Sequence, residues 1–365
     1  MANDTLNLAK NAKQNEFYTK YEDIEKEMNE YFDYDKDVFR DKTILLPCDD
    51  PEWSNFTKYF SANFNRFGLK KLISTSYASD SKGLQAVWQP TLFESEDPQY
   101  DESKSRAKGK IFTLTRRNKK INPDDLKWKY LEGDGDFRSD EVTALRDEAD
   151  IIITNPPFSL FREFFSWIMD GNKKFAIIGN QNVYTYKEIF PYIKNNDVWV
   201  GNYSGDMAFK VPKDSEPRAT RYWQDETGQK WRSMGNATWL TNLEYGKRHE
   251  PLVLMTMGDN LKYNKKLQKK LLKDFNELKY QRYDNYDAIE VPMVSAIPSD
   301  YEGVMGVPIT FLDKYNPEQF KIIGATESEG KDFSNGVWKE ESGVAQALVN
   351  NKKIYKRIFI RIIRK

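Results

Sequence analysis

The chain has 365 residues, enough for one large domain or two. Its 56 Lys and Arg residues balance 56 Asp and Glu residues, so only local patches of charge can attract nucleic acid. A single cysteine, Cys48, excludes intrachain disulfides and cysteine-rich zinc sites, and a single histidine, His249, argues against a Ser-His-Asp centre or a His-rich metal site, so we expect no bound metal. With neither a signal peptide nor a membrane span in the sequence, we expect a cytoplasmic protein that has no membrane partner.

The first 80 residues have the alternation of an α/β protein. Residues 1–14 are polar and predict a flexible arm. The elements expected after it are a charged helix, a buried strand, an aromatic-rich helix and a second strand, at residues 21–32, 43–46, 53–67 and 72–76. Gly68 is placed to end the aromatic helix. A strand, a helix and a strand in this order predict the beginning of a parallel sheet.

A polar insertion is predicted at about residues 79–128. Between residues 104 and 120 it carries eight cations and no carboxylate, and residues 111–114 predict a hairpin strand inside it. Such a run of cations is most often a solvated excursion between two core strands, and contact with phosphate is the second interpretation. Residues 132–137, Glu-Gly-Asp-Gly-Asp-Phe, then predict a turn at a strand end with an acidic tip.

The most informative stretch is residues 151–158, Ile-Ile-Ile-Thr-Asn-Pro-Pro-Phe. Three β-branched apolar residues predict a strand buried on both faces, and two prolines end it in a stiff, extended turn with Asn155 at the tip. Ser159 is expected to cap a helix whose apolar residues recur at helical spacing. A polar amide and an aromatic ring are thereby presented at the carboxyl end of a strand, where open α/β sheets bind ligands.

Methyl transfer to an exocyclic amino group needs such an arrangement, because the lone pair of that nitrogen is delocalised into the ring. Asn155 Oδ1 and the Pro156 carbonyl could accept the two amino hydrogens and localise the lone pair toward a methyl donor. Phe158 could stack on a flipped base, while Pro157 stiffens the turn. The alternative is an ordinary strand-to-helix turn with prolines at permitted positions.

Beyond the central motif the sheet is expected to continue and then to fade. Strands are predicted at residues 175–180, 198–200 and 239–243, with a helix at residues 182–193. Residues 203–235 are predicted to be loop-rich. Their aromatic residues mixed with cations fit a DNA-contact segment, although a packed hairpin has much the same composition.

The last third of the chain has no clear βα alternation. Residues 261–278 predict a basic amphipathic helix, whose lysines most often mean only a solvated face. Residues 301–312 have the character of a strand punctuated by glycine. Residues 352–365 alternate cations with apolar residues and contain no acidic residue, which predicts a terminal strand with one basic face.

Residues 155–158 resemble the catalytic motif of N6-adenine DNA methyltransferases. Further stretches resemble the EcoRI-type adenine methyltransferase family, at residues 15–19, 48–51, 133–139, 154–162, 239–243, 283–289 and 303–312. The resemblance runs from about residue 15 to the C-terminus. It implies an α/β fold of the class I S-adenosylmethionine-dependent methyltransferases, Rossmann-like with a mostly parallel sheet, over residues 15–245. A C-terminal target-recognition region would follow at residues 246–365.

The resemblance also implies S-adenosylmethionine as the methyl donor. The residues implied in its binding are Asn15, Glu16, Phe17, Tyr18 and Thr19; Cys48, Asp49 and Asp50; and Asp134, Asp136 and Phe137. Asp136 would accept from the adenine amino group of the cofactor, with Phe137 against that ring. The sequence departs from the common pattern in two places. No Gly-x-Gly follows the first strand, and the second strand ends without the acid that normally holds a ribose, so the residue that contacts the ribose is left open, with Asp80 as one candidate.

The implied reaction is in-line methyl transfer to N6 of a flipped adenine in double-stranded DNA, with Asn155 as a hydrogen-bond acceptor and not a general base. A restriction endonuclease acting on the same site is the implied protein partner. Two other functions share these features. Asn-Pro-Pro also occurs where an RNA base or a protein glutamine amide is methylated. The other alternative is a catalytically silent DNA-binding protein, against which the intact motif at residues 155–158 argues. Phe158 and the long C-terminal half favour DNA methylation.

Overall fold

The computed structural model describes residues 18–78, 100–116, 128–211, 217, 219–326 and 346–363, with only the backbone of Tyr18. The predicted arm, the cofactor residues Asn15, Glu16 and Phe17, Asp80 and most of the predicted insertion lie outside these residues. The chain divides into two compact units, Met1–Asn180 with Tyr203–Glu244 and Gln181–Asn202 with Tyr245–Lys365. No helix in the described ranges is long and apolar enough to cross a membrane.

The first unit is built on one large mixed sheet with a parallel centre. Its four central strands are β7 (Lys174–Asn180), β6 (Ile151–Thr154), β2 (Thr43–Leu46) and β3 (Lys71–Thr75), side by side in that order. Each neighbouring pair among them is parallel. The predicted α/β fold with a parallel sheet is therefore confirmed.

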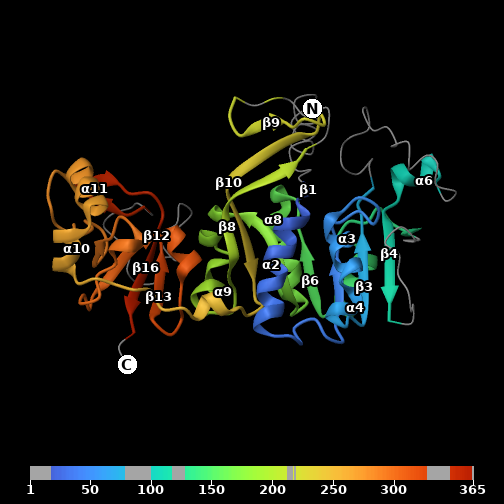
Figure 1. Cartoon of the computed structure of the whole chain (residues 1–365), viewed down its shortest axis with the longest axis horizontal. Coiled ribbons are helices and arrows are strands. Elements are labelled where there is room, and N and C mark those ends of the chain that lie inside the picture. Colours follow the sequence, from blue (N-terminus) through green and yellow to red (C-terminus); the bar gives the residue numbers. More distant parts are fainter. Residues whose placement is uncertain are drawn as a thin grey trace. The chain divides into compact units, whose positions relative to one another are not determined.

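Antiparallel strands extend this centre on both sides (Figure 1). Beyond β3 lie β4 (Lys110–Thr115) and β5 (Lys129–Tyr130), so the predicted strand at residues 111–114 is confirmed. Beyond β7 lie β10 (Lys230–Thr241), β8 (Trp199–Lys210) and β1 (Tyr18–Thr19), and β9 (Tyr222–Gln224) pairs with β10.

Helices cover both faces of this sheet. They are α2 (Tyr21–Tyr34), α3 (Asn55–Ala62), α4 (Phe64–Phe67), α7 (Asp140–Glu148) and α8 (Phe161–Asp170). A further short helix, α6 (Glu102–Ala107), comes directly before β4 in the chain. Phe56 of α3 packs edge-on against Trp239 of β10, with ring centroids 6.0 Å apart. The ring of Phe161 in α8 lies directly over Gly179 of β7. Since Trp239 pairs with Ile178, the residue next to Gly179, these two contacts are on opposite faces. The unit is a three-layer α/β/α structure.

Two expectations for helix ends change in the structure. Asn63 interrupts the predicted helix at residues 53–67, and Gly68 ends it in the left-handed region at φ 62°, as predicted. The prediction that Ser159 caps a helix is wrong. Ser159 lies inside a short 3-10 turn, η2 (Phe158–Leu160), and α8 begins only at Phe161. The extended Pro157, with ψ 119°, is followed by a tight turn in which Leu160 N donates to Pro157 O, and this turn takes the place of a cap.

The prediction that residues 203–235 form loops is also wrong. Strand β8 continues to Lys210 and β10 begins at Lys230, so most of this stretch is a projecting antiparallel ribbon, which we call the β8–β10 arm (residues 203–211 and 219–236). Only the last five residues of β10, from Ala237 to Thr241, pair with β7. The arm extends past the central strands and carries β9 at its far end (Figure 1). On the β8 side of the arm Met207, Phe209 and Val211 are buried and alternate with more exposed residues, whereas residues 230–236 of β10 are all half-buried. The β10 side therefore lacks the buried alternation that identifies a strand.

The second unit contains a smaller sheet in the order β11-β12-β16-β13. These strands are β11 (Ala288–Glu290), β12 (Val304–Pro308), β16 (Arg357–Ile362) and β13 (Phe320–Ala325), and a separate hairpin joins β14 (Leu348–Val349) to β15 (Lys352–Lys353). The short helices are η3 (Gln181–Thr185), α9 (Phe190–Lys194), η4 (Gly246–His249), α10 (Met257–Tyr263), α11 (Lys265–Phe275), η5 (Val294–Ala296) and η6 (Ile309–Lys314). The terminal strand predicted within residues 352–365 is confirmed as β16.

Two predicted helices of this unit are shorter than expected. The helix predicted at residues 182–193 is reduced to η3 and α9, and Pro191 lies in the first turn of α9. The helix predicted at residues 261–278 is divided into α10 and α11. Asn264 ends the first of these and caps the second, because its side chain accepts from Leu267 N at 3.1 Å.

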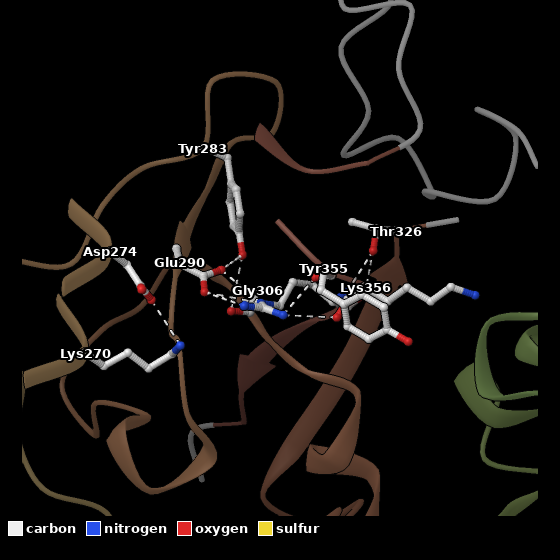
Figure 2. A network of polar contacts seen from close by, with 9 residues as sticks. Lys270, Asp274, Tyr283, Glu290, Gly306, Thr326, Tyr355 and Lys356 are labelled. Carbon is white, nitrogen blue, oxygen red and sulfur yellow. Dashed lines mark hydrogen bonds and ion pairs between the residues drawn. The ribbon is translucent and has the colours of Figure 1, made fainter. Parts of the chain in front are cut away.

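A buried ion pair joins strands β11 and β16 of this smaller sheet. The Glu290 carboxylate, 1% exposed, accepts from Arg357 Nη2 at 2.7 Å and from Arg357 Nε at 3.0 Å. The Tyr283 hydroxyl donates to the same carboxylate, and Arg357 Nη1 donates to the Tyr355 carbonyl at 2.8 Å (Figure 2). Strands β11 and β16 both pair with β12, so the ion pair bridges across that strand. The extra hydrogen bonds offset the cost of burying both charges.

Candidate active site

The strand order reverses between β2 and β6. Strand β3 lies on one side of β2 and β6 on the other, so the chain leaves β2 in one direction and returns on the opposite side. Because the strands are parallel, their carboxyl ends share one edge of the sheet. Residues 47–50 and residues 155–158 are therefore brought together at a topological switch point, where open α/β sheets bind their ligands.

The Asp49 carboxylate links the two strands at this point. Its Oδ2 accepts from Thr154 Oγ1 at 2.6 Å, and its Oδ1 accepts from Ser54 Oγ at 2.6 Å. Asp49 is only 6% exposed, and burial raises the pKa of its carboxyl to about 7, although the hydroxyls of Ser54 and Thr154 partly oppose that change. Thr154 directly precedes Asn155, so Asp49 holds the beginning of the Asn155 turn.

The Ser54 hydroxyl has a second partner. It accepts from Phe56 N at 3.0 Å and caps α3, so the same side chain connects the start of that helix to the Asp49 carboxylate. The loop after β2, strand β6 and helix α3 are thereby fixed to one another by side chains around a single carboxylate.

The amide of Asn155 is oriented by Thr19 of β1. Asn155 Nδ2 donates to Thr19 Oγ1 over 3.4 Å, and the Thr19 carbonyl accepts from Asn55 Nδ2 at 2.8 Å. With its nitrogen directed to Thr19, the amide directs Oδ1 the other way, as a hydrogen-bond acceptor. Asn155 and Phe158 are half-buried, and Pro156 between them is buried. The structure thus brings the predicted residues Thr19, Asp49 and Asn155 together.

Asp50 and Cys48 lie in the same loop, both half-buried. The Asp50 side chain turns the loop locally, because Oδ1 accepts from Glu52 N at 2.9 Å while its backbone carbonyl accepts from Ser54 N at 3.0 Å. Within this loop Asp50 is half-buried, whereas its neighbour Asp49 is buried and anchors the loop to β6.

The acidic turn predicted at residues 132–137 packs against the end of β3. Ala78 N donates to Asp134 O at 2.7 Å, and the Tyr77 hydroxyl donates to Asp136 Oδ2 at 3.1 Å. Gly135 has φ +81°, and a Cβ at this position would lie 2.1 Å from the Ser76 carbonyl oxygen, so only glycine permits this close approach.

The Asp136 carboxylate is held as an anion. Burial raises the pKa of this carboxyl, but hydrogen bonds from Arg138 and Tyr77 outweigh burial and leave the pKa below its ordinary value. Arg138 Nη2 donates to Asp136 Oδ2 at 2.6 Å. Phe137, by contrast, is 5% exposed and packs edge-on against Phe164 of α8, with centroids 5.0 Å apart.

Comparison with known proteins identifies the chain's relatives. A profile of the family described as "Adenine-specific methyltransferase EcoRI" matches residues 5–364. The Type II methyltransferase M.EcoRI of Escherichia coli is 40% identical over 361 residues, which cover 97% of this chain and 98% of that protein. The chain belongs to this adenine-specific methyltransferase family.

Two relatives from Mycoplasma agree with this assignment. The Type II methyltransferase M.MgeORF184P of Mycoplasma genitalium is 33% identical and covers 98% of both chains. The Type II methyltransferase M.MpnI of Mycoplasma pneumoniae is 32% identical over 87% of this chain and 84% of that protein. No solved structure is significantly similar to the chain. The chain is a site-specific DNA adenine methyltransferase, and the methyltransferases of this family use S-adenosylmethionine.

Three contact residues of this adenine-specific methyltransferase were not predicted from the sequence. Ser54 and Thr154 hold the Asp49 carboxylate, and Asn55 holds the Thr19 backbone. Ser54 had a detectable signal, since it lies at the cap position of the aromatic helix. Thr154 and Asn55 had none, because their partners are distant in sequence. In the described part of the chain, no group of three or more His, Cys, Asp or Glu residues could hold a metal ion.

Proposed function

We propose that this methyltransferase transfers the methyl group of S-adenosylmethionine to N6 of an adenine flipped out of double-stranded DNA, with Asn155 at the centre of the site. The observation that carries the proposal is the contact between Asp49 and Thr154 at the switch point of the sheet. This contact fixes the Asn155 turn beside the loop after β2, so the target amino group and the methyl donor would meet at one edge of the sheet.

The residues 155–158 would hold the target adenine. Asn155 Oδ1 and the Pro156 carbonyl would accept the two hydrogens of the amino group, and Phe158 would stack on the flipped base. Pro157 keeps the turn extended, with φ −58° and ψ 119°. When bound, the cofactor supplies an activated methyl group. Asn155 is no general base, because an amide has no useful basicity, and the proton would leave to solvent.

The cofactor would be held by side chains on either side of the switch point. Thr19 and the preceding Asn15, Glu16, Phe17 and Tyr18 would border it, together with Cys48 and Asp50. Asp134 and the anionic Asp136 at the end of β3 provide carboxylates that can accept from amino groups, which suits this cofactor. The buried Asp49 would hold the neighbouring Asp50 in position, and the buried Phe137 would do the same for the neighbouring Asp136.

The wider assignments follow from the relatives, which are named Type II methyltransferases. We assign residues 15–245 to cofactor binding and catalysis and residues 246–365 to target recognition. We also assign the chain a cognate restriction endonuclease that acts on the same DNA site, and a place in the cytoplasm.

The test is to offer the purified protein unmodified genomic DNA, total RNA and a protein extract, with labelled S-adenosylmethionine. We expect label in DNA alone, and sequencing should find N6-methyladenine within one short motif. Label in RNA or in a glutamine side chain would replace the proposal with one of the alternatives. A protein that binds DNA but neither binds the cofactor nor transfers label would be the catalytically silent form.

A further inference from the structure

The β8–β10 arm carries two tryptophans in register near its far end. Trp223 of β9 pairs directly with Trp231 of β10, and their rings are 6.4 Å apart and nearly parallel, at 11°. Trp223 is 41% exposed, a large apolar surface for a side chain on a projecting ribbon. A cross-strand pair of tryptophans stabilises a hairpin when one face of each ring is covered. The arm therefore does not need the exposed surface of Trp223 for its own stability.

Two cations lie over the Trp231 ring, and a third lies further along the same ribbon. Lys20 Nζ lies 4.7 Å and Lys210 Nζ lies 5.6 Å from the centroid of Trp231. Arg221 lies two residues before Trp223, and its guanidinium covers Gly235, where a Cβ would lie 1.8 Å from Nη1. We call Lys20, Lys210, Arg221, Trp223 and Trp231 the tryptophan face.

Carboxylates near the tryptophan face include Asp23, which interacts with Lys20, and Asp206 and Asp225 on the arm. Asp225 accepts from Thr227 Oγ1, Trp231 Nε1 and backbone amides of the turn, which lowers its pKa to about 2 and commits the carboxylate to holding the hairpin. Asp206 pairs with Arg221 at 3.3 Å, but both side chains are more than half exposed. An ion pair of that kind is weak and easily exchanged for another anion.

The tryptophan face begins next to the catalytic turn. Strand β1 pairs with β8, with Thr19 opposite Phe209, and Thr19 contacts the Asn155 amide over 3.4 Å. Lys20 is the next residue, one Cα step of about 3.8 Å further along the chain. Burial lowers the pKa of Lys58 most, the charge of Lys210 lowers it further and Asp50 opposes both, so Lys210 lies close enough to Lys58 for their charges to interact.

The base of the arm is also fixed in place. The buried Glu27 carboxylate of α2 accepts from Tyr203 N at 2.9 Å and from the Tyr31 hydroxyl at 2.6 Å. A cationic and aromatic surface thus extends from the catalytic turn along a ribbon that is anchored at its lower end.

We propose that the tryptophan face binds the DNA duplex immediately beside the target adenine. Lys20, Lys210 and Arg221 contact backbone phosphates, and Trp223 packs on a base or sugar of the same stretch. An antiparallel two-stranded ribbon is narrow enough for a DNA groove, and aromatic side chains stack on bases of any sequence. This inference rests on the proposed function, because it places the DNA by way of the adenine held at Asn155.

Two variants separate the phosphate contacts from the stacking contact. Lys210→Gln should reduce the slope of log affinity against log salt by about one phosphate contact. Trp223→Ala should weaken DNA binding about 5- to 100-fold, the range for one stacked aromatic, and Trp223→Phe should restore most of it. Affinity is measured on an unmethylated duplex at several salt concentrations, together with cofactor affinity and thermal unfolding.

Matched controls come from the other end of α2. Lys36→Gln and Tyr34→Ala remove an exposed cation and an exposed aromatic, and a helix of 14 residues places them about 20 Å from Lys20. Both controls should leave the DNA affinity and the salt slope unchanged.

The outcomes are distinct from those for the proposed function. If the wild-type protein methylates adenine but Lys210→Gln keeps the wild-type salt slope and Trp223→Ala keeps the wild-type affinity, the tryptophan face does not touch DNA. If Trp223→Phe is as impaired as Trp223→Ala while cofactor affinity and melting temperature stay at wild-type values, an aromatic ring at this position does not restore binding and the proposed stacking contact is overturned. If the wild-type protein methylates no adenine, the proposed function fails, whatever these variants do.

Discussion

Replacement of the buried Asp49 by Asn tests how the active site is held. The side chain keeps its shape and loses its charge. Burial raises the pKa of the Asp49 carboxyl from its ordinary 3.8 to about 7, which corresponds to about 4 kcal/mol of free energy between the two protonation states. Because the folded-state pKa lies above the unfolded-state pKa, the stabilising contribution is full below about pH 4 and is lost as pH rises through about 7.

The amide of Asp49→Asn does not titrate, so the variant escapes this loss. Between pH 5 and pH 8 its stability relative to the wild-type protein should therefore rise by about 2.5 kcal/mol, whatever constant amount the changed hydrogen bonds cost. The measurement is guanidinium unfolding at both pH values, followed by the fluorescence of the nine tryptophans. The exposed Asp170→Asn is the control and should change by less than about 0.5 kcal/mol at either pH.

The methylation activity of Asp49→Asn should fall, although its stability relative to the wild-type protein rises with pH. An amide has one acceptor oxygen where Asp49 has two, so either Thr154 or Ser54 loses its acceptor. Turnover should then fall by about 10- to 100-fold, because the Asn155 turn is no longer held in register. The reasoning is refuted if the relative stability of Asp49→Asn is the same at pH 5 and pH 8, or if its turnover equals that of the wild-type protein.

The remaining predictions concern the acidic turn and the smaller sheet. Gly135→Ala forces a Cβ against the Ser76 carbonyl at positive φ and should cost at least about 1–3 kcal/mol in chemical unfolding and weaken cofactor binding, whereas Gly258→Ala in α10, where a Cβ meets nothing within 4 Å, should be neutral or slightly stabilising. Glu290→Gln leaves the Arg357 guanidinium buried without its counter-charge and should cost about 3–5 kcal/mol, and the double variant with Arg357→Met should regain part of that loss in the same unfolding assay. A wild-type melting temperature for Glu290→Gln would show that the ion pair is not buried as described.

The sequence predicted the parts of the site that depend on neighbouring residues. Ile151 to Ile153 are each at most 2% exposed, because three β-branched residues can only form a strand covered on both faces here, and two prolines end it locally. The same local reasoning failed at Ser159, since the turn after Pro157 is closed by a backbone hydrogen bond that no side-chain pattern announces.

Contacts that depend on topology were beyond this reasoning. Thr154 and Asp49 are 105 positions apart, and they meet only because β2 and β6 are adjacent strands. The β8–β10 arm was missed for another reason. Residues 230–236 of β10 are all half-buried, so no buried face imposes the pattern that marks a strand at a sheet surface, although Met207, Phe209 and Val211 on the β8 side are buried and alternate.

The most direct measurement of the role of Asn155 is steady-state methylation by Asn155→Ala, with separate binding measurements for S-adenosylmethionine and DNA. Loss of the acceptor for the target amino group should lower kcat by about 100-fold or more, because that hydrogen bond matters most when the lone pair is being localised. Both affinities should stay near the wild-type values, and the exposed Asn65→Ala should behave as the wild-type protein does. Wild-type kcat in Asn155→Ala would contradict the assignment of residues 155–158 as the catalytic turn.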